Sequence, residues 1–287
     1  MNKKVEKTID KLMQRIKEVD DQWTKEWKPV LQCNVKGRPY TGINQVVLTM
    51  AAALCNYTSP YWLTFNTIKK MGGKVRKGER GMHITFVRII EEDESNDGRR
   101  HVILRGYTVF NACQADGLPE AFYMEQTRFS MDAIDGMLAQ LGVTVKVGNK
   151  ACYIPSQDVI LMPPAHTFHS KAGYYKVLMH ELVHWTGKRL DRNVGDQRAK
   201  AYAFEELVAE IGASLLAAAF DLDADVDNSA AYIKSWMRFL QDDAEAFVKA
   251  SKKAAQAFDY IIKEGGLTIQ YDDLHEHDNS EHEKAHL

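Results

Sequence analysis

The chain has only four cysteines among 287 residues, and no two of them form a CxxC pair. Cysteines this sparse argue against a cysteine zinc site and against a disulfide framework, and they fit a reducing compartment. The charged N-terminal residues lack the apolar segment of a signal peptide, so we expect a cytoplasmic protein. The longest apolar run, 46–55, is interrupted by Thr49 and is too short to span a bilayer, so no membrane partner is expected.

The chain also has almost no net charge, −2 in total, but the two signs are unevenly distributed. Residues 1–128 hold 21 of the 37 Lys and Arg and 15 of the 39 Asp and Glu, a charge of +6. The remainder holds the other 16 basic and 24 acidic residues, a charge of −8. Such an asymmetry suggests a polyanionic partner for the first part, although uneven surface charge is also common without one.

The composition is that of an ordinary globular protein, with 45% hydrophobic and 26% charged residues, and the length suits two domains. The pattern predicts an α+β fold. We expect an N-terminal α+β domain at 1–128, a mainly helical domain with a small sheet at 129–271, and a disordered polar tail at 272–287.

Hydrophobic periodicity predicts the elements of both parts. In the first part we expect helices at 5–28, 43–56 and 61–71, the last capped by Thr58-Ser59-Pro60, and strands at 83–90 and 100–110 joined by a polar loop at 91–98. In the second part we expect helices at 130–141, 171–186, 199–220, 229–240 and 242–263, with strands at 144–147, 151–154 and 158–162.

The most informative motif is His180-Glu181-Leu182-Val183-His184. On a helix, two histidines four residues apart lie on one face and can bind one Zn²⁺ ion. Glu181 would stand beside the ion, where it can deprotonate a metal-bound water. The motif also occurs by chance, in roughly a few per cent of chains of this composition, so the alternative is a surface accident. The amphipathic pattern around it favours a helix.

The helix expected at 199–220 can supply the third ligand that a catalytic zinc site needs. Glu206 and Glu210 lie one turn apart in an otherwise apolar stretch, and buried carboxylates are costly unless they meet a cation or donors. We expect Glu206 to bind the metal, as in gluzincins, and Glu210 to accept from the free N–H of a ligand histidine. Glu205, about 100° around the helix, is expected to face solvent. Small residues such as Gly212 would let this helix approach the histidines.

Residues 57–88 combine aromatic and basic side chains in a way that favours binding of single-stranded nucleic acid. Exposed rings can stack on bases, and a glycine-punctuated basic segment can follow phosphates. The alternative is that the rings, Trp62 and Phe65 among them, are core residues and that the basic segment is a solvated hairpin. No helix-turn-helix or cysteine finger for reading duplex DNA is visible. The candidate DNA-binding residues are Tyr40, Tyr57, Tyr61, Trp62, Lys69, Lys70, Lys74, Arg76, Lys77 and Arg80.

Both parts resemble one known family. The second part is similar to the zincin-like metallopeptidase domain of ArdC antirestriction proteins in Tyr174-Tyr175, 180–187, Arg189-Leu190 and 205–213. The first part looks like that family's N-terminal single-stranded-DNA-binding domain, also found on TraC-type plasmid primases. Its matching segments are 37–44, 57–65, 72–81 and 109–112.

The resemblance spans roughly residues 5–265 and implies a protein of mobile elements that protects incoming DNA from host restriction. It implies single-stranded DNA as a partner, Zn²⁺ or another divalent metal as cofactor, and a host protein or peptide as a further candidate partner. In the peptidase reaction Glu181 would take a proton from metal-bound water and return it to the leaving amine. The strand at 159–162 would hold an extended peptide as an edge strand.

Two other hypotheses stay open. One is a DNA-coating protein whose metal site is structural or inactive. The other is a metallopeptidase whose basic half recognises an acidic protein. Whether the chain is an active zinc peptidase is not decided by the motif.

Overall fold

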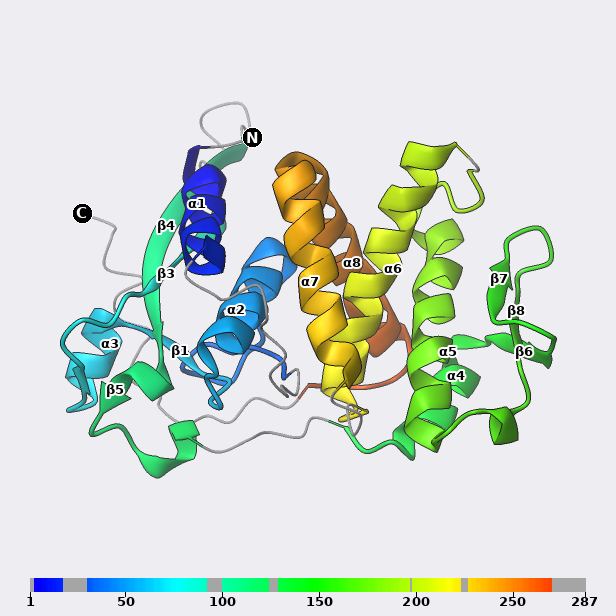
Figure 1. Ribbon diagram of the computed structural model, residues 1–287, viewed down its shortest axis with the longest axis horizontal. Coiled ribbons are helices and arrows are strands. Elements are labelled where there is room, and N and C mark those ends of the chain that lie inside the picture. The colour runs from blue at the N-terminus through cyan, green and yellow to red at the C-terminus, as the bar shows by residue number, and fades with distance from the viewer. Residues whose placement is uncertain are drawn as a thin grey trace.

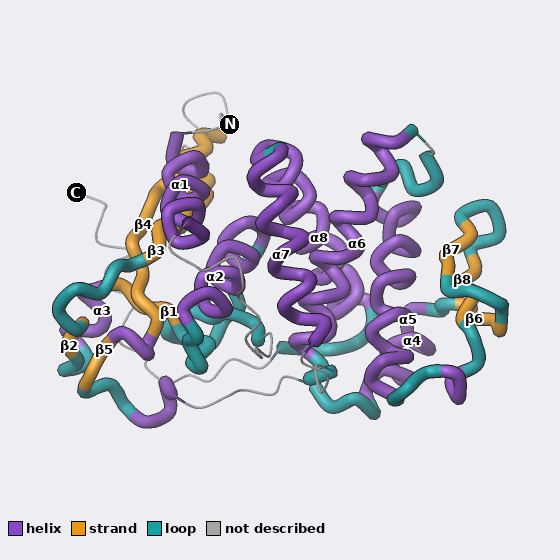
Figure 2. Tube along the Cα trace, in the orientation of Figure 1, coloured by secondary structure: helices purple, strands orange, loops and turns teal. Residues whose placement is uncertain are grey.

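The structure, a computed structural model, describes residues 3–17, 30–91, 100–123, 129–196, 198–222 and 227–269. Figures 1 and 2 show a strand-containing region at one end, long helices side by side in the middle and a small sheet at the other end. The predicted α+β class, with a mainly helical second part that carries a small sheet, is confirmed. Among the described residues, no helix combines the length and the apolar character that crossing a bilayer requires.

The first region is built on a three-stranded antiparallel sheet with the order β1-β4-β3. Its elements are α1 (Lys3–Lys17), α2 (Gly42–Cys55), β1 (Trp62–Thr64), α3 (Phe65–Lys70), β2 (Lys74–Val75), β3 (Met82–Glu91), β4 (Arg100–Asn111), η1 (Ala112–Gln114), β5 (Ala115–Asp116) and η2 (Glu120–Tyr123). The strands predicted at 83–90 and 100–110 form the β3–β4 hairpin. In α2, the side-chain amide of Asn44 both donates to the Thr85 carbonyl and accepts from the Thr85 N–H, which attaches this helix to the outer strand.

The sequence predicts one helix over 61–71, but the structure has a strand followed by a helix there. β1 pairs with the end of β4, and α3 begins only at Phe65. The cap of α3 is Thr64, whose hydroxyl accepts from the Thr67 N–H at 3.2 Å, and not the segment 58–60. Pairing with a strand distant in sequence has overridden the local preference.

Parts of three predictions lie outside the described residues. The described part of the first helix ends at Lys17, and the predicted residues 18–28 are outside. The same holds for residues 92–98 of the polar loop and for the whole tail at 272–287.

The second region matches the predicted order of elements closely. Its elements are α4 (Ala133–Leu141), β6 (Thr144–Val147), β7 (Cys152–Ile154), β8 (Val159–Met162), η3 (Ala165–Thr167), α5 (Lys171–Trp185), η4 (Thr186–Leu190), α6 (Ala199–Ala219), α7 (Asp227–Asp242) and α8 (Ala244–Glu264). One prediction about its sheet is wrong. β8 is the central strand, parallel to β6 and antiparallel to β7, so both of its edges are already paired. The edges of this sheet are β6 and β7.

One large cluster of buried apolar side chains extends through both parts of the chain. α2, from the first part, is buried from Asn44 to Leu54 and packs against α8, from the second part. A smaller cluster around Tyr61, Leu63 and Phe122 lies under β1 and η1. The two parts therefore share a core, and the division near residue 128 is still a prediction.

Candidate metal centre and nucleic-acid surface

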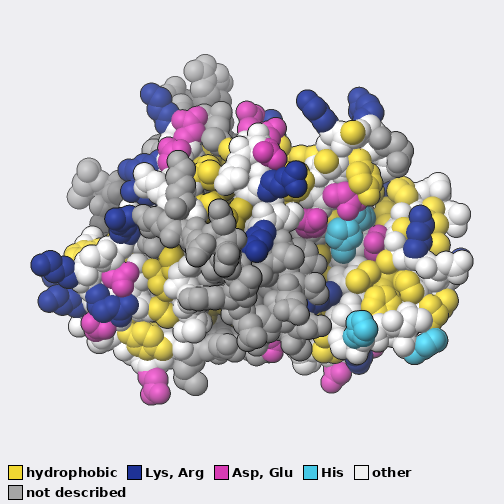
Figure 3. Space-filling model, in the orientation of Figure 1, with side chains coloured by type: hydrophobic (Ala, Val, Ile, Leu, Met, Phe, Trp, Pro, Cys, Tyr) yellow, Lys and Arg dark blue, Asp and Glu magenta, His cyan; other side chains and the backbone are white. Residues whose placement is uncertain are grey.

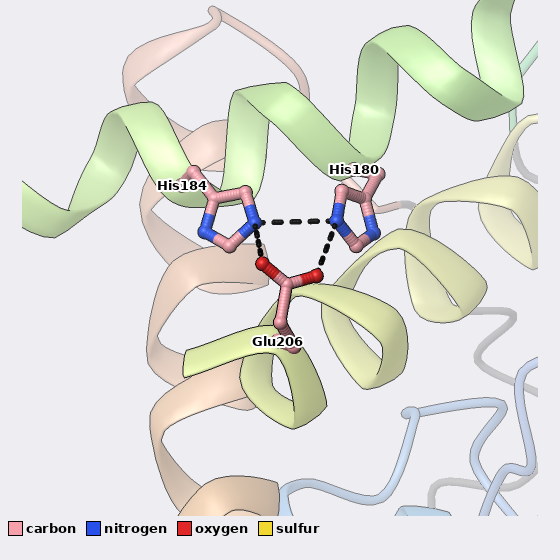
Figure 4. A group of neighbouring side chains, drawn as sticks. All are labelled: His180, His184 and Glu206. Atoms are coloured by element: carbon pink, nitrogen blue, oxygen red, sulfur yellow. Dashed lines mark hydrogen bonds and ion pairs between the residues drawn. The ribbon is translucent and has the colours of Figure 1, made fainter. Parts of the chain in front are cut away.

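The His180–His184 motif lies in the last turns of α5. The helix begins after Ser170, whose hydroxyl accepts from the Gly173 N–H at 2.9 Å. Apolar residues fix the rest of it in the core: Leu178, Met179, Leu182, Val183 and Trp185. Because the two histidines are four residues apart, both rings face α6 (Figure 4).

Three side chains converge on one point between α5 and α6 (Figure 4). His180 Nε2 lies 3.2 Å from His184 Nε2 and 3.4 Å from Glu206 Oε2. His184 Nε2 lies 3.6 Å from Glu206 Oε1. Around a tetrahedral ion with bonds of about 2.0–2.1 Å, ligand atoms stand roughly 3.3 Å apart. The separations therefore fit a divalent cation of the zinc type bound by two imidazoles and a carboxylate.

The second nitrogen of His184 indicates which atom of the ring carries the lone pair. His184 Nδ1 lies 3.2 Å from Glu205 Oε1. An ionised carboxylate can only accept, so Nδ1 carries the proton and Nε2 presents its lone pair toward Glu206 and His180. This is the tautomer that a metal ligand needs.

The charges around the site favour a cation. The hydrogen bond from His180 lowers the pKa of Glu206, and partial burial opposes this shift. Burial alone would lower the pKa of His180, but its bond to Glu206 and the charge of Glu181 raise the pKa above its ordinary value. A position that binds a proton this readily has a negative potential, which a divalent cation also experiences.

Glu181 is held beside the two histidines by the neighbouring sheet. Its side chain is buried, and Oε2 accepts from the backbone N–H of Tyr153 in β7 at 2.8 Å. Sequence reasoning did not identify Tyr153, because a main-chain donor leaves no residue-type signal. The catalytic role of Glu181 is still a prediction.

Two acidic residues of α6 do not occupy their predicted places. Glu205, expected to face solvent, is only 7% exposed, and its carboxylate accepts hydrogen bonds from both His184 and Arg192. Glu210, expected to accept from a ligand histidine, instead accepts from Ser235 of α7 at 3.3 Å, and burial raises its pKa. The reason is geometric. Glu205 and Glu206, in the second turn of α6, both lie against the histidines of α5, whereas Glu210 lies one turn farther along the helix, opposite α7.

A cavity of about 400 Å³ opens beside the three converging side chains. Its walls are β7, the loop at 193–196 and the first turns of α6. Tyr202 lines it, 52% exposed, and a hydrogen bond to Glu206 raises the pKa of its phenol. In Figure 3 the histidine and acidic side chains of this region lie between hydrophobic patches on the surface.

The predicted base-stacking rings are mostly core residues. Tyr40, Tyr61 and Trp62 are 8%, 0% and 1% exposed. The indole of Trp62 donates to Gln32 Oε1 at 2.7 Å, and the hydroxyl of Tyr40 donates to the Trp62 carbonyl. Tyr57 is half-buried against the same indole. Stacking on a base through Tyr40, Tyr61 or Trp62 is therefore excluded, because Tyr40 and Trp62 are buried in the large cluster and Tyr61 is buried in the smaller one, against Phe122.

The six predicted basic residues, in contrast, are all exposed: Lys69, Lys70, Lys74, Arg76, Lys77 and Arg80. In Figure 3, Lys and Arg side chains gather at the end of the molecule where Figure 1 shows α3 and β5. Arg76 is partly committed to this fold, since it donates to Glu79, Asp116 and the Cys113 carbonyl. The exposed ring beside these residues is Phe65, 54% exposed and in edge contact with Phe110.

Two family models match separate parts of the chain. Residues 2–110 match the model of the N-terminal domain of anti-restriction factor ArdC. Residues 132–253 match the model of a zincin-like metallopeptidase.

Similar proteins are known by sequence and by structure. The crystal structure of antirestriction ArdC from plasmid R388, metal-free, has 39% sequence identity and a TM-score of 0.71, covering 93% of this chain and 100% of that one. The Mn(II)-bound structure of the same protein gives the same identity and TM-score. An uncharacterised Sinorhizobium fredii protein, y4eC, is 32% identical, and the match covers 78% of each chain. An Escherichia coli DNA primase TraC is 32% identical over 90% of this chain, but the chain spans only 27% of that primase.

Proposed function

This chain belongs to the ArdC family of antirestriction proteins, and we propose that it binds single-stranded DNA with its first part and a divalent metal with its second. Through these activities it would protect incoming mobile-element DNA from host restriction. The observation that carries the metal half of the proposal is the convergence of His180, His184 and Glu206 within 4.8 Å of one another.

Zinc is the proposed ion, because two imidazoles and one carboxylate form a common catalytic zinc ligand set. The relative with Mn(II) bound makes manganese the main alternative. Imidazole and carboxylate ligands accommodate both ions, so the residues alone do not select one. Metal analysis of the purified chain, followed by affinity measurements with each ion, distinguishes the two.

The peptidase chemistry would use groups of this chain around the bound ion. A divalent ion in this position supplies an acidified water and polarises a carbonyl. Glu181, buried beside both histidines, would accept a proton and pass it to a leaving amine. Tyr202 lines the same cavity and could donate a hydrogen bond to a substrate oxygen. The backbone N–H of Tyr153 keeps the Glu181 carboxylate turned toward the site.

The DNA half of the proposal relies on the exposed basic surface of α3 and the following turn. Neutral rings such as Phe65 can stack on any base, and lysines beside them can contact phosphates. The surface we propose consists of Phe65, Lys69, Lys70, Lys74, Lys77 and Arg80. Arg76 contributes mainly by holding the turn in place, because its guanidinium is paired within the fold.

The DNA half is tested with a single-stranded oligonucleotide in a fluorescence anisotropy titration at several salt concentrations. In the Lys74→Ala, Lys77→Ala double variant we expect weaker binding and a shallower salt dependence. The slope of the logarithm of the affinity against the logarithm of the salt concentration should decrease by about 0.7 per lost phosphate contact. Lys252→Ala, Lys253→Ala on α8 is the matched control. Unchanged affinity and slope in the first variant would exclude this surface.

The second half is tested with Glu181→Gln and His184→Ala in an assay of protection against restriction, together with metal analysis. If proteolysis underlies protection, both variants lose it, and Glu181→Gln keeps its metal.

A DNA-coating protein with a structural metal site is the second candidate. The feature that favours it is the hydrogen bond from the Tyr153 N–H to Glu181. This bond uses an outward-facing N–H of the edge strand β7, which an extended peptide substrate would otherwise need for pairing with that strand. This candidate predicts that Glu181→Gln leaves both DNA binding and protection intact.

A further inference from the structure

Arg192 is a buried cation that no part of the proposed chemistry uses. Its side chain is 3% exposed, and a guanidinium in such a place is costly unless its donors are satisfied. Nε donates to Glu205 Oε2 at 3.1 Å, and Nη2 donates to Glu205 Oε1 at 3.0 Å. Nη1 donates to Thr186 Oγ1 at 2.9 Å, and Nη2 also to the Val183 carbonyl at 2.6 Å. Its three nitrogens are all engaged, most strongly with Glu205.

The backbone between α5 and α6 is shaped to bring this arginine back under the end of α5. Asp191 adopts the left-handed conformation, with φ of 50°, and reverses the chain. The Arg192 N–H then donates to the Gly187 carbonyl at 2.8 Å. Position 187 has to be glycine, because a Cβ there would collide with the side chain of Val194. The turn therefore places Arg192 against the helix that bears the histidines.

Glu205 connects this arginine to a metal-ligand candidate. Its Oε1 accepts from Arg192 Nη2 at 3.0 Å and also lies 3.2 Å from His184 Nδ1, while its Oε2 accepts from Arg192 Nε. Two parallel donors fix the plane of a carboxylate in a way that one ammonium cannot. The side chain of Glu205 is 10% exposed, so water does not compete freely for its oxygens.

We propose that Arg192 and Glu205 form a buried clamp that holds His184 as the Nδ1–H tautomer and aims its Nε2 lone pair at the metal position. Arg192 is thus a positioning residue that acts on the metal position through Glu205 and His184. The adjacent carboxylates of α6 then have separate tasks: Glu206 faces the ion, and Glu205 orients a ligand. The inference rests on the proposed metal site only for its effect on affinity, because the tautomer is a property of the metal-free protein.

The tautomer is measured directly by two-bond ¹H–¹⁵N correlation spectra of the histidine rings in the metal-free full chain at pH 8.5. In the unaltered protein we expect His184 to show a protonated Nδ1 and an unprotonated Nε2. In Glu205→Gln a single amide oxygen is left for both Arg192 and His184 Nδ1, so we expect the Nε2–H form of His184, which can donate to Glu206, to gain population. Retention of the Nδ1–H form in both Glu205→Gln and Arg192→Met would overturn the proposal.

The consequence for the metal is measured as Zn²⁺ affinity by competition with a chromophoric chelator. Loss of an outer-shell partner typically weakens a metal site about 10- to 100-fold, and we expect this for Glu205→Gln and Arg192→Met. Arg192→Lys should recover part of the affinity, since it restores charge without the fork. The matched controls are Glu210→Gln on the same helix and Arg189→Met in the preceding turn, both expected within about two-fold of the unaltered protein.

Folding is checked by circular dichroism before each measurement. If Arg192→Met does not fold, the isosteric Glu205→Gln decides, because it removes the charge without a cavity. Unchanged Zn²⁺ affinity in a folded Glu205→Gln contradicts the clamp. A wild-type chain that binds no Zn²⁺ would instead refute the proposed zinc site, and the tautomer spectra would still decide the clamp.

Discussion

At the scale of single residues, the candidate metal site depends on how individual polar atoms are oriented. His180 and Glu206 share a hydrogen bond that a metal would replace, since the same lone pairs are involved. The bond, together with the nearby charge of Glu181, raises the pKa of His180 although burial opposes the shift. A proton and a divalent cation would therefore compete for one position.

This competition predicts the effect of Glu206→Gln. Removing the carboxylate takes away a charge and an acceptor that favour protonated His180, so the pKa of His180 should fall. Divalent-metal affinity should fall too, because a third ligand is lost. NMR titration of the metal-free variant measures the pKa of His180, and chelator competition measures the metal affinity. A His180 pKa that is unchanged or raised in Glu206→Gln would contradict the geometry in Figure 4.

A second residue-scale prediction concerns the ion pair between Asp158, just before β8, and Arg189 in η4. Asp158 accepts both terminal nitrogens of Arg189, and this bond lowers its pKa to about 2, with further help from Tyr153. The folded pKa lies below the unfolded one, so the stabilisation is complete above about pH 4 and disappears as the pH falls toward 2. The pair is partly exposed, which limits its contribution to about 1 kcal/mol.

Asp158→Asn tests this pair cleanly. Asn tolerates the left-handed backbone of position 158, with φ of 55°, so the substitution removes the charge without adding strain. The free energy of unfolding, measured in urea, should decrease near pH 7, and the difference from the unaltered protein should shrink below pH 4. A difference that is constant over the whole pH range would refute the assignment.

The sequence could predict which side chains converge at the candidate metal position, but not the roles of their neighbours. A histidine spacing of four and a lone carboxylate in an apolar helix are local patterns, and they indicated His180, His184 and Glu206. Whether Glu205 or Glu210 reaches His184 depends on how α6 crosses α5. That angle arises from packing among distant segments, and it leaves no trace in the spacing.

At the scale of elements, the site depends on how closely α5 and α6 approach. Gly212 of α6 lies against Val183 of α5, where an added Cβ would stand 2.8 Å from one methyl carbon and 3.0 Å from the other. Its contact is with backbone-proximal atoms of a buried β-branched side chain, which cannot move aside easily. The glycine therefore sets the spacing between the two helices that carry the candidate ligands.

Two Gly→Ala substitutions with opposite expected signs test this spacing. In an open helical position the change should stabilise by up to about 1 kcal/mol, and Gly136 in α4 has no neighbour within 4 Å of an added Cβ. At Gly212 the collision should reverse the sign, with a loss of about 1–3 kcal/mol. Melting temperatures report both, and metal affinity should fall only for Gly212→Ala. Stabilisation by Gly212→Ala would show that the helices are not tightly packed there.

Elements with a strong periodic pattern were predictable, and elements made by long-range pairing were not. The helices of the second part were indicated nearly residue by residue, because their apolar faces repeat over many turns. The strand at Trp62–Thr64 was missed, since three residues carry no period and their pairing partner lies near residue 110. The aromatic cluster was assigned to DNA for the same reason: the core that buries Tyr61 and Trp62 is built from distant segments.

At the scale of the whole molecule, the shared core couples the two parts. α2 lies between the sheet of the first part and α8 of the second, with nearly every residue from Asn44 to Leu54 buried. α8 in turn packs against α6, which carries Glu206. A change in either part therefore reaches the other through side chains that are already in van der Waals contact.

This coupling predicts a single thermal transition that responds to metal as a unit. Ligand that binds only the folded state stabilises by about 2.7 kcal/mol at 100 times its dissociation constant. Because the parts share one core, the indole of Trp62, which lies in the first part, should report the same shift in melting temperature as the calorimetric transition.

Differential scanning calorimetry and tryptophan fluorescence, with and without Zn²⁺, provide the comparison. Trp62→Phe identifies the contribution of that indole, and Glu206→Gln should abolish the shift. Two resolved transitions, with only one moved by metal, would mean that the two parts unfold independently and that metal in the second part cannot stabilise the first part.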